Sequence, residues 1–416
     1  MAKVLFISGS VGLGHVTRDI AIISELRKIN RDLKVDWLAA HPASVALKQA
    51  GENLLPEADF YANDSTAAEQ AAAGHSLNLL KYLTSASRHW KNNVELFRKT
   101  TSKASYDLII GDETYELIVA FRKDPSLKKA PMVMIYDFIG LDVVSHNPLD
   151  WLGTYIWNRL WSEDYRKRRP PVFDLGLYVG KEEDVPDKSF GPLLPNRRDF
   201  AKKYLEFIGY VFPFDPSNYS DTVKLREKLK YGNGPLILCS VGGTSIGKDL
   251  LDLCAAAYPH MERQIPGLKM VIVCGPRIDA SEFKIPLGVE IKGFVPCLYE
   301  HFAACDLAIV QGGATSTFEI AALGKPFIYF PVEGHFEQAQ VAERLTRYGA
   351  GARMSCSRTT PADLAEKAVS TIGKKISYAK IPAVGAQKAA NLIAHRFLGK
   401  MPPDSVVSAP GLAKLK

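Results

Sequence analysis

The sequence has few features of a metal-binding, disulfide-rich or membrane-spanning protein. Its 416 residues include six cysteines, and no two of them form a Cys-x-x-Cys pair, so neither a zinc site nor a disulfide framework is indicated. No apolar stretch approaches the roughly 20 residues of a transmembrane helix. The opening MAKVLFISGS lacks the long apolar region and cleavage site of a signal peptide. We therefore expect a cytoplasmic protein, soluble or peripheral on the inner face of a membrane.

Several common nucleotide-binding signatures are also missing. The first glycine-rich loop, with Gly9, Gly12 and Gly14, reads G-x-x-G-x-G rather than the dinucleotide pattern G-x-G-x-x-G. No acidic residue ends the second predicted strand, where it would bind a ribose hydroxyl, and the loop lacks the Gly-Lys-Ser/Thr ending of a P-loop. A D-x-D metal motif is absent too. These absences argue against NAD-dependent and P-loop enzymes and predict chemistry that needs no metal and no cofactor.

Length and composition are those of a two-domain globular protein. The chain is 47% hydrophobic and carries a net charge of +7, and 416 residues exceed what one ordinary core accommodates. The modest basic excess suits an anionic partner, such as a nucleotide, a phospholipid surface or a nucleic acid. An ordinary solvated surface explains the same excess, so charge alone does not identify the partner.

Short apolar runs alternate with helical patterns in two similar halves, which predicts doubly wound parallel sheets. The first half has predicted strands at 3–8, 34–40, 106–111 and 131–136, and the second at 235–240, 268–274, 289–292, 307–310 and 326–330. Prolines and aromatic residues cluster at 210–216, between the halves. We therefore predict domains over 1–212 and 213–385, a helix over 386–400 that returns to the first domain, and a loose tail over 401–416.

Glycine loops follow the first strand of each half, at the sheet edge where open α/β folds bind ligands. Such loops let backbone N–H groups approach an anion at a helix N-terminus. A tight turn without a ligand is the alternative for the first loop taken alone.

Motifs in the second half of the chain indicate which ligand these loops bind. Gly-Phe-Val-Pro at 293–296 is followed by Gly-Gly-Ala-Thr-Ser-Thr-x-Glu at 312–319, Gly-x-Pro at 324–326, a Glu-Gln pair at 337–338 and Arg-x-Gly-Ala-Gly at 347–351. This order resembles the donor-binding domain of GT-B glycosyltransferases, nearest to the MurG-like group and the UDP-glycosyltransferases. The resemblance implies two Rossmann-like domains that face each other across a cleft, and a UDP-sugar as donor substrate.

The resemblance also implies roles for individual residues. The backbone at Phe294 and Val295 would bind uracil, Glu319 the ribose hydroxyls, and Glu337 and Gln338 the sugar. The diphosphate would lie at the helix that follows the second glycine loop. Relatives often carry histidine or arginine where this chain has Gln311, which adds no positive charge. The residues implied at the diphosphate are Gly242, Gly243, Thr244, Gln311, Gly312, Gly313, Ala314, Thr315 and Ser316.

His15 is the candidate catalytic base because histidine titrates near neutral pH and can take a proton from the acceptor hydroxyl. Asp112, after the strand at 106–111, would hold the other ring nitrogen, and Asp137 is the reserve base. His15 could instead bind an acceptor phosphate together with Gly12 and Gly14, and a structural histidine is the third reading. The reaction expected is inverting hexosyl transfer, with a nucleotide-sugar hydrolase or epimerase, or a non-catalytic binding subunit, as alternatives.

The segment 148–171 gives a weaker indication of the acceptor. Leu149, Leu152, Ile156 and Leu160 recur at helical spacing among three tryptophans, and Arg-Lys-Arg-Arg follows at 166–169. An amphipathic aromatic helix beside a basic patch is typical of an anionic membrane surface and suggests a lipid or lipid-linked acceptor. A helix packed on its own domain is the alternative. No RNA-binding motif supports a nucleic-acid partner.

Overall fold

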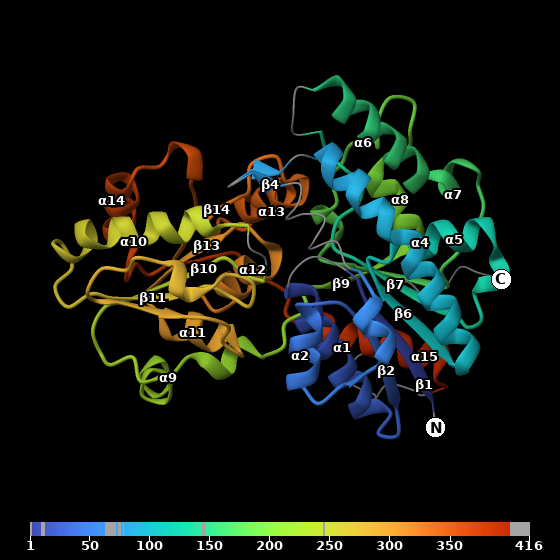
Figure 1. The fold of residues 1–416 in the computed structure, drawn as a ribbon, viewed down its shortest axis with the longest axis horizontal. Helices are drawn as coiled ribbons and strands as arrows, with labels where there is room; N and C mark the ends of the chain where they lie inside the picture. Colours follow the sequence, from blue (N-terminus) through green and yellow to red (C-terminus); the bar gives the residue numbers. More distant parts are fainter. Residues whose placement is uncertain are drawn as a thin grey trace.

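The chain forms two α/β lobes (Figure 1). The structure, a computed structural model, describes residues 2–9, 13–62, 72–73, 76–77, 79–143, 147–243 and 246–399, with only the backbone over 72–88. A small antiparallel pair, β4 (Ala72–Ala73) and β5 (Ser76–Leu77), stands apart from the main sheets. The predicted pair of doubly wound parallel sheets is confirmed.

The N-terminal lobe is built on a seven-stranded parallel sheet in the order β3-β2-β1-β6-β7-β8-β9. Its central strands are apolar runs that are buried along almost their whole length, as expected of a sheet covered on both faces. The strands are β1 (Lys3–Ser8), β2 (Lys34–Ala39), β3 (Asn53–Leu54), β6 (Leu108–Asp112), β7 (Met132–Tyr136), β8 (Leu175–Val179) and β9 (Leu205–Gly209).

Helices cover both faces of this sheet and enclose two apolar cores. One face carries α1 and α2, and the other carries α4, α5 and α8. The helices of this lobe are α1 (Gly14–Ile29), α2 (Ala43–Gln49), α4 (Leu79–Lys103), α5 (Tyr115–Lys123), α6 (Pro148–Trp161), α7 (Glu163–Arg166) and α8 (Arg197–Tyr204).

The C-terminal lobe repeats the plan with a six-stranded parallel sheet in the order β12-β11-β10-β13-β14-β15. Its strands are β10 (Leu236–Ser240), β11 (Lys269–Val273), β12 (Val289–Lys292), β13 (Leu307–Gln311), β14 (Phe327–Phe330) and β15 (Ala352–Arg353). Its helices are α9 (Thr222–Leu229), α10 (Lys248–Glu262), α11 (Leu298–Ala304), α12 (Ala314–Ala322), α13 (Phe336–Arg347) and α14 (Pro361–Thr371).

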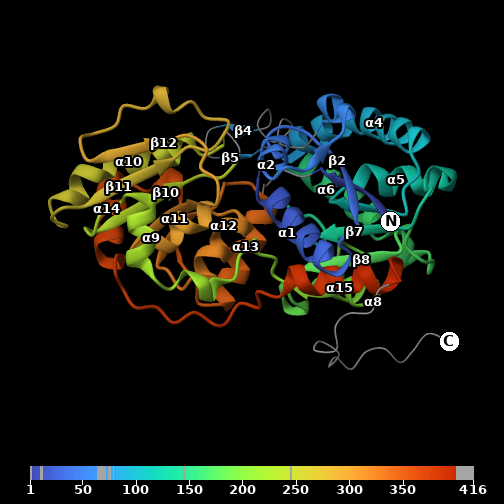
Figure 2. The same cartoon turned by 90° about the horizontal axis from the view of Figure 1, so that it is seen from below.

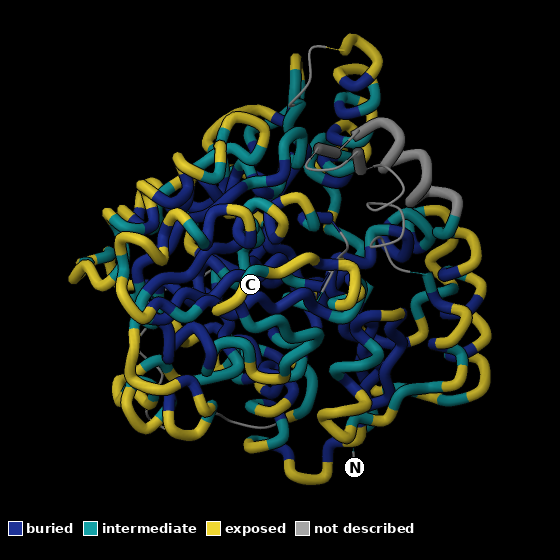
Figure 3. The backbone as a smooth tube through the Cα atoms, turned by 60° about the vertical axis from the view of Figure 1, so that its left-hand side comes forward, coloured by how far each residue is buried: buried dark blue, intermediate teal, exposed yellow. Residues whose placement is uncertain are grey.

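The last helix, α15 (Gly385–Phe397), returns to the N-terminal lobe and lies along α1 (Figure 2). Ile393 and Ala394 join the core that contains Ile22 and Leu26 of α1. Buried residues fill the interior and exposed residues follow the outer helices (Figure 3). The chain therefore crosses between the lobes twice, and both crossings help to fix how the lobes face each other.

Candidate active site

The ends of the central strands of both sheets meet at one small cavity between the lobes. In each sheet this is the point where the strand order reverses, next to β1 and β6 in one and β10 and β13 in the other. The cavity has a volume of about 120 Å³ and receives residues from both lobes. Its lining includes Leu13, Gly14, His15, Asp137, Val241, Gly242, Gly243, Ile246, Gln311, Gly313, Ala314, Thr315, Ser316, Val332, His335, Glu337 and Gln338.

Three helices begin at this cavity without a side-chain cap, and α10 begins close by, just after Ile246. The N-cap residues Leu13 of α1, Gly247 of α10, Gly313 of α12 and His335 of α13 make no capping hydrogen bond through a side chain. The first backbone N–H groups of each helix therefore lack that partner, and each helix dipole places partial positive charge at the same space. Such an arrangement suits an anion of high charge, such as a diphosphate.

His15 lies in the first turn of α1 and reaches the end of β6. Its Nδ1 atom is 2.9 Å from Oδ2 of Asp112, and its Nε2 atom is 3.7 Å from Oδ2 of Asp137. The register Ser8↔Asp112 between β1 and β6 places the aspartate beside the loop that leads into α1. The structure thus brings together all three residues that the sequence suggested for catalysis.

Arg18, one turn after His15, connects the two aspartates. Its Nη1 donates to Oδ2 of Asp137 at 2.7 Å and its Nη2 donates to Oδ1 of Asp112 at 2.5 Å. Nη2 also lies 2.7 Å from Nδ1 of His15. Burial alone would raise the pKa of each carboxyl, but the charges of Arg18 and His15 hold the pKa of Asp112 and of Asp137 below the ordinary value. Two ionised carboxylates therefore surround the imidazole, with Arg18 as their buried counter-ion.

Glu113 completes this cluster. It has a positive φ of 54° at the end of β6 and is buried. Burial, together with the charge of Asp137 and a hydrogen bond between the two carboxyl groups, raises the pKa of Glu113 well above its ordinary value. These effects favour the protonated form of Glu113 beside the carboxylate of Asp137.

Ligand-type atoms of His15, Glu113 and Asp137 lie within 4.8 Å of one another, which is the spacing of a metal site. Arg18 already donates to Asp137, and its positive charge at this point opposes a second cation. The cluster fits a proton-transfer network better than a metal centre.

The two lobes touch directly at Gly14. A Cβ atom on Gly14 would lie 2.2 Å from Oγ1 and 2.9 Å from Cβ of Thr315, so only glycine allows α1 and α12 to meet here. Gly14 thus has a structural reason to be glycine, which is independent of a phosphate contact. Gly12, the other acceptor-loop residue suggested by the sequence, lies outside the described residues, as does Thr244.

Most of the predicted donor residues surround the cavity, but two have additional local roles. Nε2 of Gln311 donates to the carbonyl of Ile246 at 3.0 Å and so ties the Gly242–Gly247 loop to β13. Oε1 of Gln338 accepts from the backbone N–H of Val332 at 2.8 Å. Glu337 is free to face the cavity, and burial and the nearby Asp137 raise its pKa to about 7.

Four predicted donor residues are not part of the cavity wall. Glu319 lies one turn into α12 and is buried, and burial raises its pKa to about 8. Gly312 packs against Pro331 and donates its N–H to the carbonyl of Phe330. Phe294 and Val295 are half-buried in the connection between β12 and α11.

Arg18, Glu113 and His335 belong to the site but were not suggested by the sequence. Nδ1 of His335 is buried and has no hydrogen-bond partner among the described residues, and burial lowers the pKa of this histidine to about 4. The sequence indicated them only through their position close to predicted site residues. Arg18 and Glu113 follow His15 and Asp112 closely, and His335 precedes the Glu-Gln pair.

Comparison with known proteins agrees with this geometry. Residues 237–397 match the glycosyltransferase family 28 C-terminal domain. A glycosyltransferase of Methanosarcina acetivorans is 30% identical over 375 residues, which cover 86% of each chain. The chain belongs to the glycosyltransferases. Another relative, a glycosyltransferase of Methanosarcina mazei, is 34% identical to this chain over 241 residues, which cover 52% of this chain and 63% of the relative.

The glycosyltransferase also resembles MurG-type enzymes over part of its length. The UDP-N-acetylglucosamine–N-acetylmuramyl-(pentapeptide) pyrophosphoryl-undecaprenol N-acetylglucosamine transferase of Rhodopseudomonas palustris is 31% identical over 144 residues, 32% of this chain and 38% of that one. The chain spans less than two thirds of the length of two Methanosarcina mazei relatives, at 63% and 64%.

Solved structures confirm the GT-B architecture. The kitacinnamycin glycosyltransferase aligns with a TM-score of 0.58 at 15% identity, over 95% of this chain and 98% of that one. MurG of Acinetobacter baumannii aligns with a TM-score of 0.52 at 16% identity, over 96% and 100%. At such identities the likeness establishes the fold of the glycosyltransferase, not its substrates.

Proposed function

We propose that this glycosyltransferase transfers a hexose from a UDP-sugar to an acceptor hydroxyl or phosphate, with inversion at the anomeric carbon. One observation carries the proposal: the uncapped N-terminus of α12 faces His15 across a cavity that also receives Glu337 and Gln338. This arrangement offers an anion site, a base and sugar ligands within one small space.

The donor would extend along α12. Its diphosphate takes the backbone N–H groups at Gly313–Ser316, where the helix dipole stabilises negative charge, and its ribose hydroxyls reach the buried carboxyl of Glu319. Glu337 and Gln338 bind the sugar, and the connection at Phe294 and Val295 binds the base. Gly242 and Gly243, which follow β10, would contact the diphosphate from another side.

His15 would act as the general base. This role requires the ring proton on Nδ1, so that the imidazole donates to Oδ2 of Asp112 and leaves the lone pair of Nε2 for the acceptor. Nη2 of Arg18, which can only donate, then bonds Oδ1 of Asp112 and not Nδ1. The acceptor oxygen forms a bond to the anomeric carbon, its proton moves to Nε2, and the bond from that carbon to the UDP oxygen breaks. Asp112 and Asp137 stabilise the resulting imidazolium, and the helix N-termini stabilise the leaving diphosphate without a metal.

The acceptor is proposed to be a lipid or lipid-linked molecule presented at an anionic membrane. The exposed face of α6 supports this, because Leu149, Leu152 and Ile156 are 60%, 48% and 50% exposed. The MurG-type relatives, whose printed name specifies a pyrophosphoryl-undecaprenol acceptor, support it too. In the described part of the chain, no helix is long and apolar enough to cross a membrane.

The proposal is tested by incubation with UDP-, GDP- and dTDP-sugars, with and without a lipid extract, while nucleotide release is measured. UDP-sugars should be turned over, and His15→Ala should lower kcat by roughly 10²–10⁴ without changing the affinity for UDP. Full activity of the variant would contradict the role of His15. Loss of activity in EDTA that magnesium restores would contradict metal independence.

A further inference from the structure

A second and larger cavity adjoins the active-site cavity in the C-terminal lobe. Its volume is about 680 Å³, and it lies between the β14–α13 connection and the segment that follows β15. Val332 and His335 line both cavities, so the two spaces share a wall. Nothing in the proposed function uses this second space.

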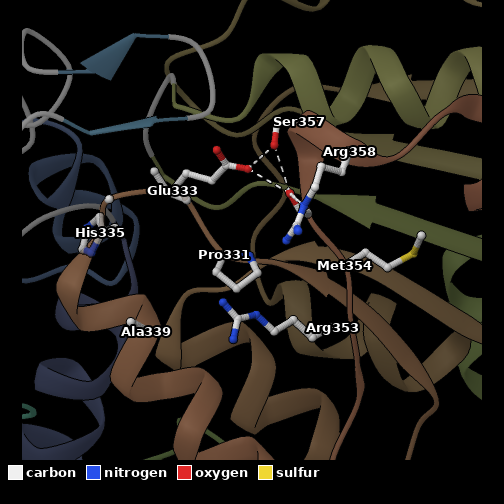
Figure 4. Close-up of a pocket in the computed structure, with 11 residues that line it drawn as sticks. Pro331, Glu333, His335, Ala339, Arg353, Met354, Ser357 and Arg358 are labelled. Atoms are coloured by element: carbon white, nitrogen blue, oxygen red, sulfur yellow. Dashed lines mark hydrogen bonds between the residues drawn. The ribbon is translucent and has the colours of Figure 1, made fainter. Parts of the chain in front are cut away.

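Two arginines dominate its electrostatics. Arg353 ends β15, and its side chain makes no hydrogen bond or ion pair with any described residue. Arg358 has a single side-chain hydrogen bond in the described structure, from Nε to Oγ of Ser355 at 3.4 Å. Both guanidinium groups turn toward Pro331 in the pocket wall (Figure 4). No carboxylate of a described residue pairs with either guanidinium, and both arginines are exposed.

The one carboxylate of this pocket is already occupied. Oε1 of Glu333 accepts from the hydroxyls of Ser355 and Ser357, as Figure 4 shows for the segment after β15. These bonds hold the 355–358 turn, and therefore Arg358, against the β14–α13 connection. One anion against two cations leaves the pocket with a positive charge.

His335 lies in the shared wall and adds a polar atom without a partner. Its Nδ1 is buried and has no hydrogen bond to a described residue. Burial lowers the pKa of His335 to about 4, so the ring is neutral at physiological pH and can accept or donate a hydrogen bond.

We propose that the arginine pocket, formed around Arg353 and Arg358, binds an anionic group of the substrate, a carboxylate or a phosphate. The proposal rests on the proposed function, because the adjoining cavity is assigned to the donor sugar. Guanidinium groups bind both kinds of anion through paired charge-assisted hydrogen bonds. The anion belongs either to an acidic donor sugar or to the acceptor, and the two sources are distinguished by experiment.

The donor arm compares UDP-glucose with UDP-glucuronate, which differ only in a carboxylate on the sugar. Binding to the purified full chain is measured by calorimetry, with UDP alone as reference. If the anion is on the donor, UDP-glucuronate binds about tenfold more tightly than UDP-glucose, which corresponds to about 1.4 kcal/mol. The acceptor arm compares geranyl phosphate with geraniol on enzyme saturated with UDP, which fills the helix N-termini. If the anion is on the acceptor, only the phosphate binds.

Two variants locate the effect. Arg353→Gln and Arg358→Gln should each remove most of the anion-dependent gain and leave the affinity for UDP unchanged. Arg263→Gln is the matched control, because it removes an exposed cation at the end of α10 and should preserve the gain. The proposal is overturned if neither anionic probe binds better than its neutral counterpart, or if the gain survives both pocket variants. Failure of UDP itself to bind would refute the donor assignment. Geranyl phosphate and geraniol would then be compared without UDP, and only a gain that Arg353→Gln and Arg358→Gln remove would support the arginine pocket.

Discussion

At the residue scale, part of the catalytic cluster could be predicted and part could not. His15 and Asp112 follow glycine-flanked strand ends, which sequence patterns indicate well. Arg18 follows His15 by three positions and reads as a polar surface residue of an amphipathic helix. Its burial to 4% depends on Asp112 and Asp137 from two other strands, and no local pattern contains that information.

The buried carboxyl of Glu319 should make the stability of the enzyme depend on pH. Burial raises its pKa from 4.5 to about 8, so ionising this carboxyl costs more in the folded state than in the unfolded one. The protonated group's contribution to stability is complete below pH 4.5 and is lost as the pH rises through about 8. Glu319→Gln should therefore raise the melting temperature of the ligand-free enzyme more at pH 8.5 than at pH 5.

The same residue links nucleotide binding to proton release. Ribose hydroxyls donate hydrogen bonds, and a carboxylate accepts them better than a carboxylic acid does. UDP binding at pH 7 should therefore release a proton, measured by calorimetry in buffers of different ionisation enthalpy. Glu319→Gln should lose this release, and Glu319→Ala should weaken UDP binding by about 1–3 kcal/mol. Glu337→Gln, at a second acid with a raised pKa, is the control. Undiminished proton release in Glu319→Gln would refute the ribose contact.

At the element scale, the strands with continuous apolar runs were predictable, whereas the edge of the first sheet was not. All nine strands expected from the sequence are present within a residue or two of their predicted ends. β8 and β9 were missed, as were the short strands β3, β4, β5 and β15. A glycine interrupts the apolar run of β8 (LGLYV), and a glutamate interrupts that of β9 (LEFIG). β9 also follows α8 without a loop, so no turn signal separates the two elements.

The meeting of α1 and α12 predicts a strong effect of one methyl group. Gly14→Ala places a Cβ against Thr315. The threonine side chain is too short to move aside, so α1 must withdraw from α12. We expect a larger radius of gyration by small-angle scattering and a reduced kcat. Gly313→Ala, where a Cβ meets nothing within 4 Å, should leave the radius unchanged. Replacing Thr315 by glycine in the Gly14→Ala background should restore the compact form, and failure to do so would contradict the steric explanation.

Helix α6 predicts how the enzyme associates with a membrane. The structure weakens the basic half of the sequence argument, because Lys167 pairs with Glu163 and Arg169 with Asp164. The apolar face therefore carries more of the expected binding, and Leu149→Gln with Ile156→Gln should abolish sedimentation with anionic vesicles. Leu287→Gln, at a residue that is 97% exposed on the other lobe, should have no effect. Wild-type enzyme that ignores such vesicles at low salt would favour a soluble acceptor.

At the scale of the whole molecule, α13 couples the donor site to the N-terminal lobe. Glu337 and Gln338 in its first turn face the cavity. Another face of the helix contacts the opposite lobe: Phe336 packs edge-on against Phe138 with ring centroids 5.1 Å apart, and Gln340 donates to Oδ2 of Asp142 at 3.0 Å. Such a division of faces could not be predicted from the sequence, because it depends on how the two lobes meet.

Arg344 of α13 also makes two hydrogen bonds to the opposite lobe. Its Nη2 donates to the backbone carbonyl of Asp137 at 2.5 Å and to the hydroxyl of Tyr178 at 2.8 Å, and its side chain is buried. Arg344→Leu leaves the carbonyl without this donor, at a cost of about 1–3 kcal/mol, and frees the lobes to separate. Because Asp137 neighbours His15 and Glu337 begins the same helix, kcat should fall and KM for the donor should rise together. Arg347→Gln removes only a partly exposed ion pair with Asp184 and should change both constants much less. An Arg344→Leu enzyme with wild-type kcat and KM would show that the donor site works without this link between the lobes.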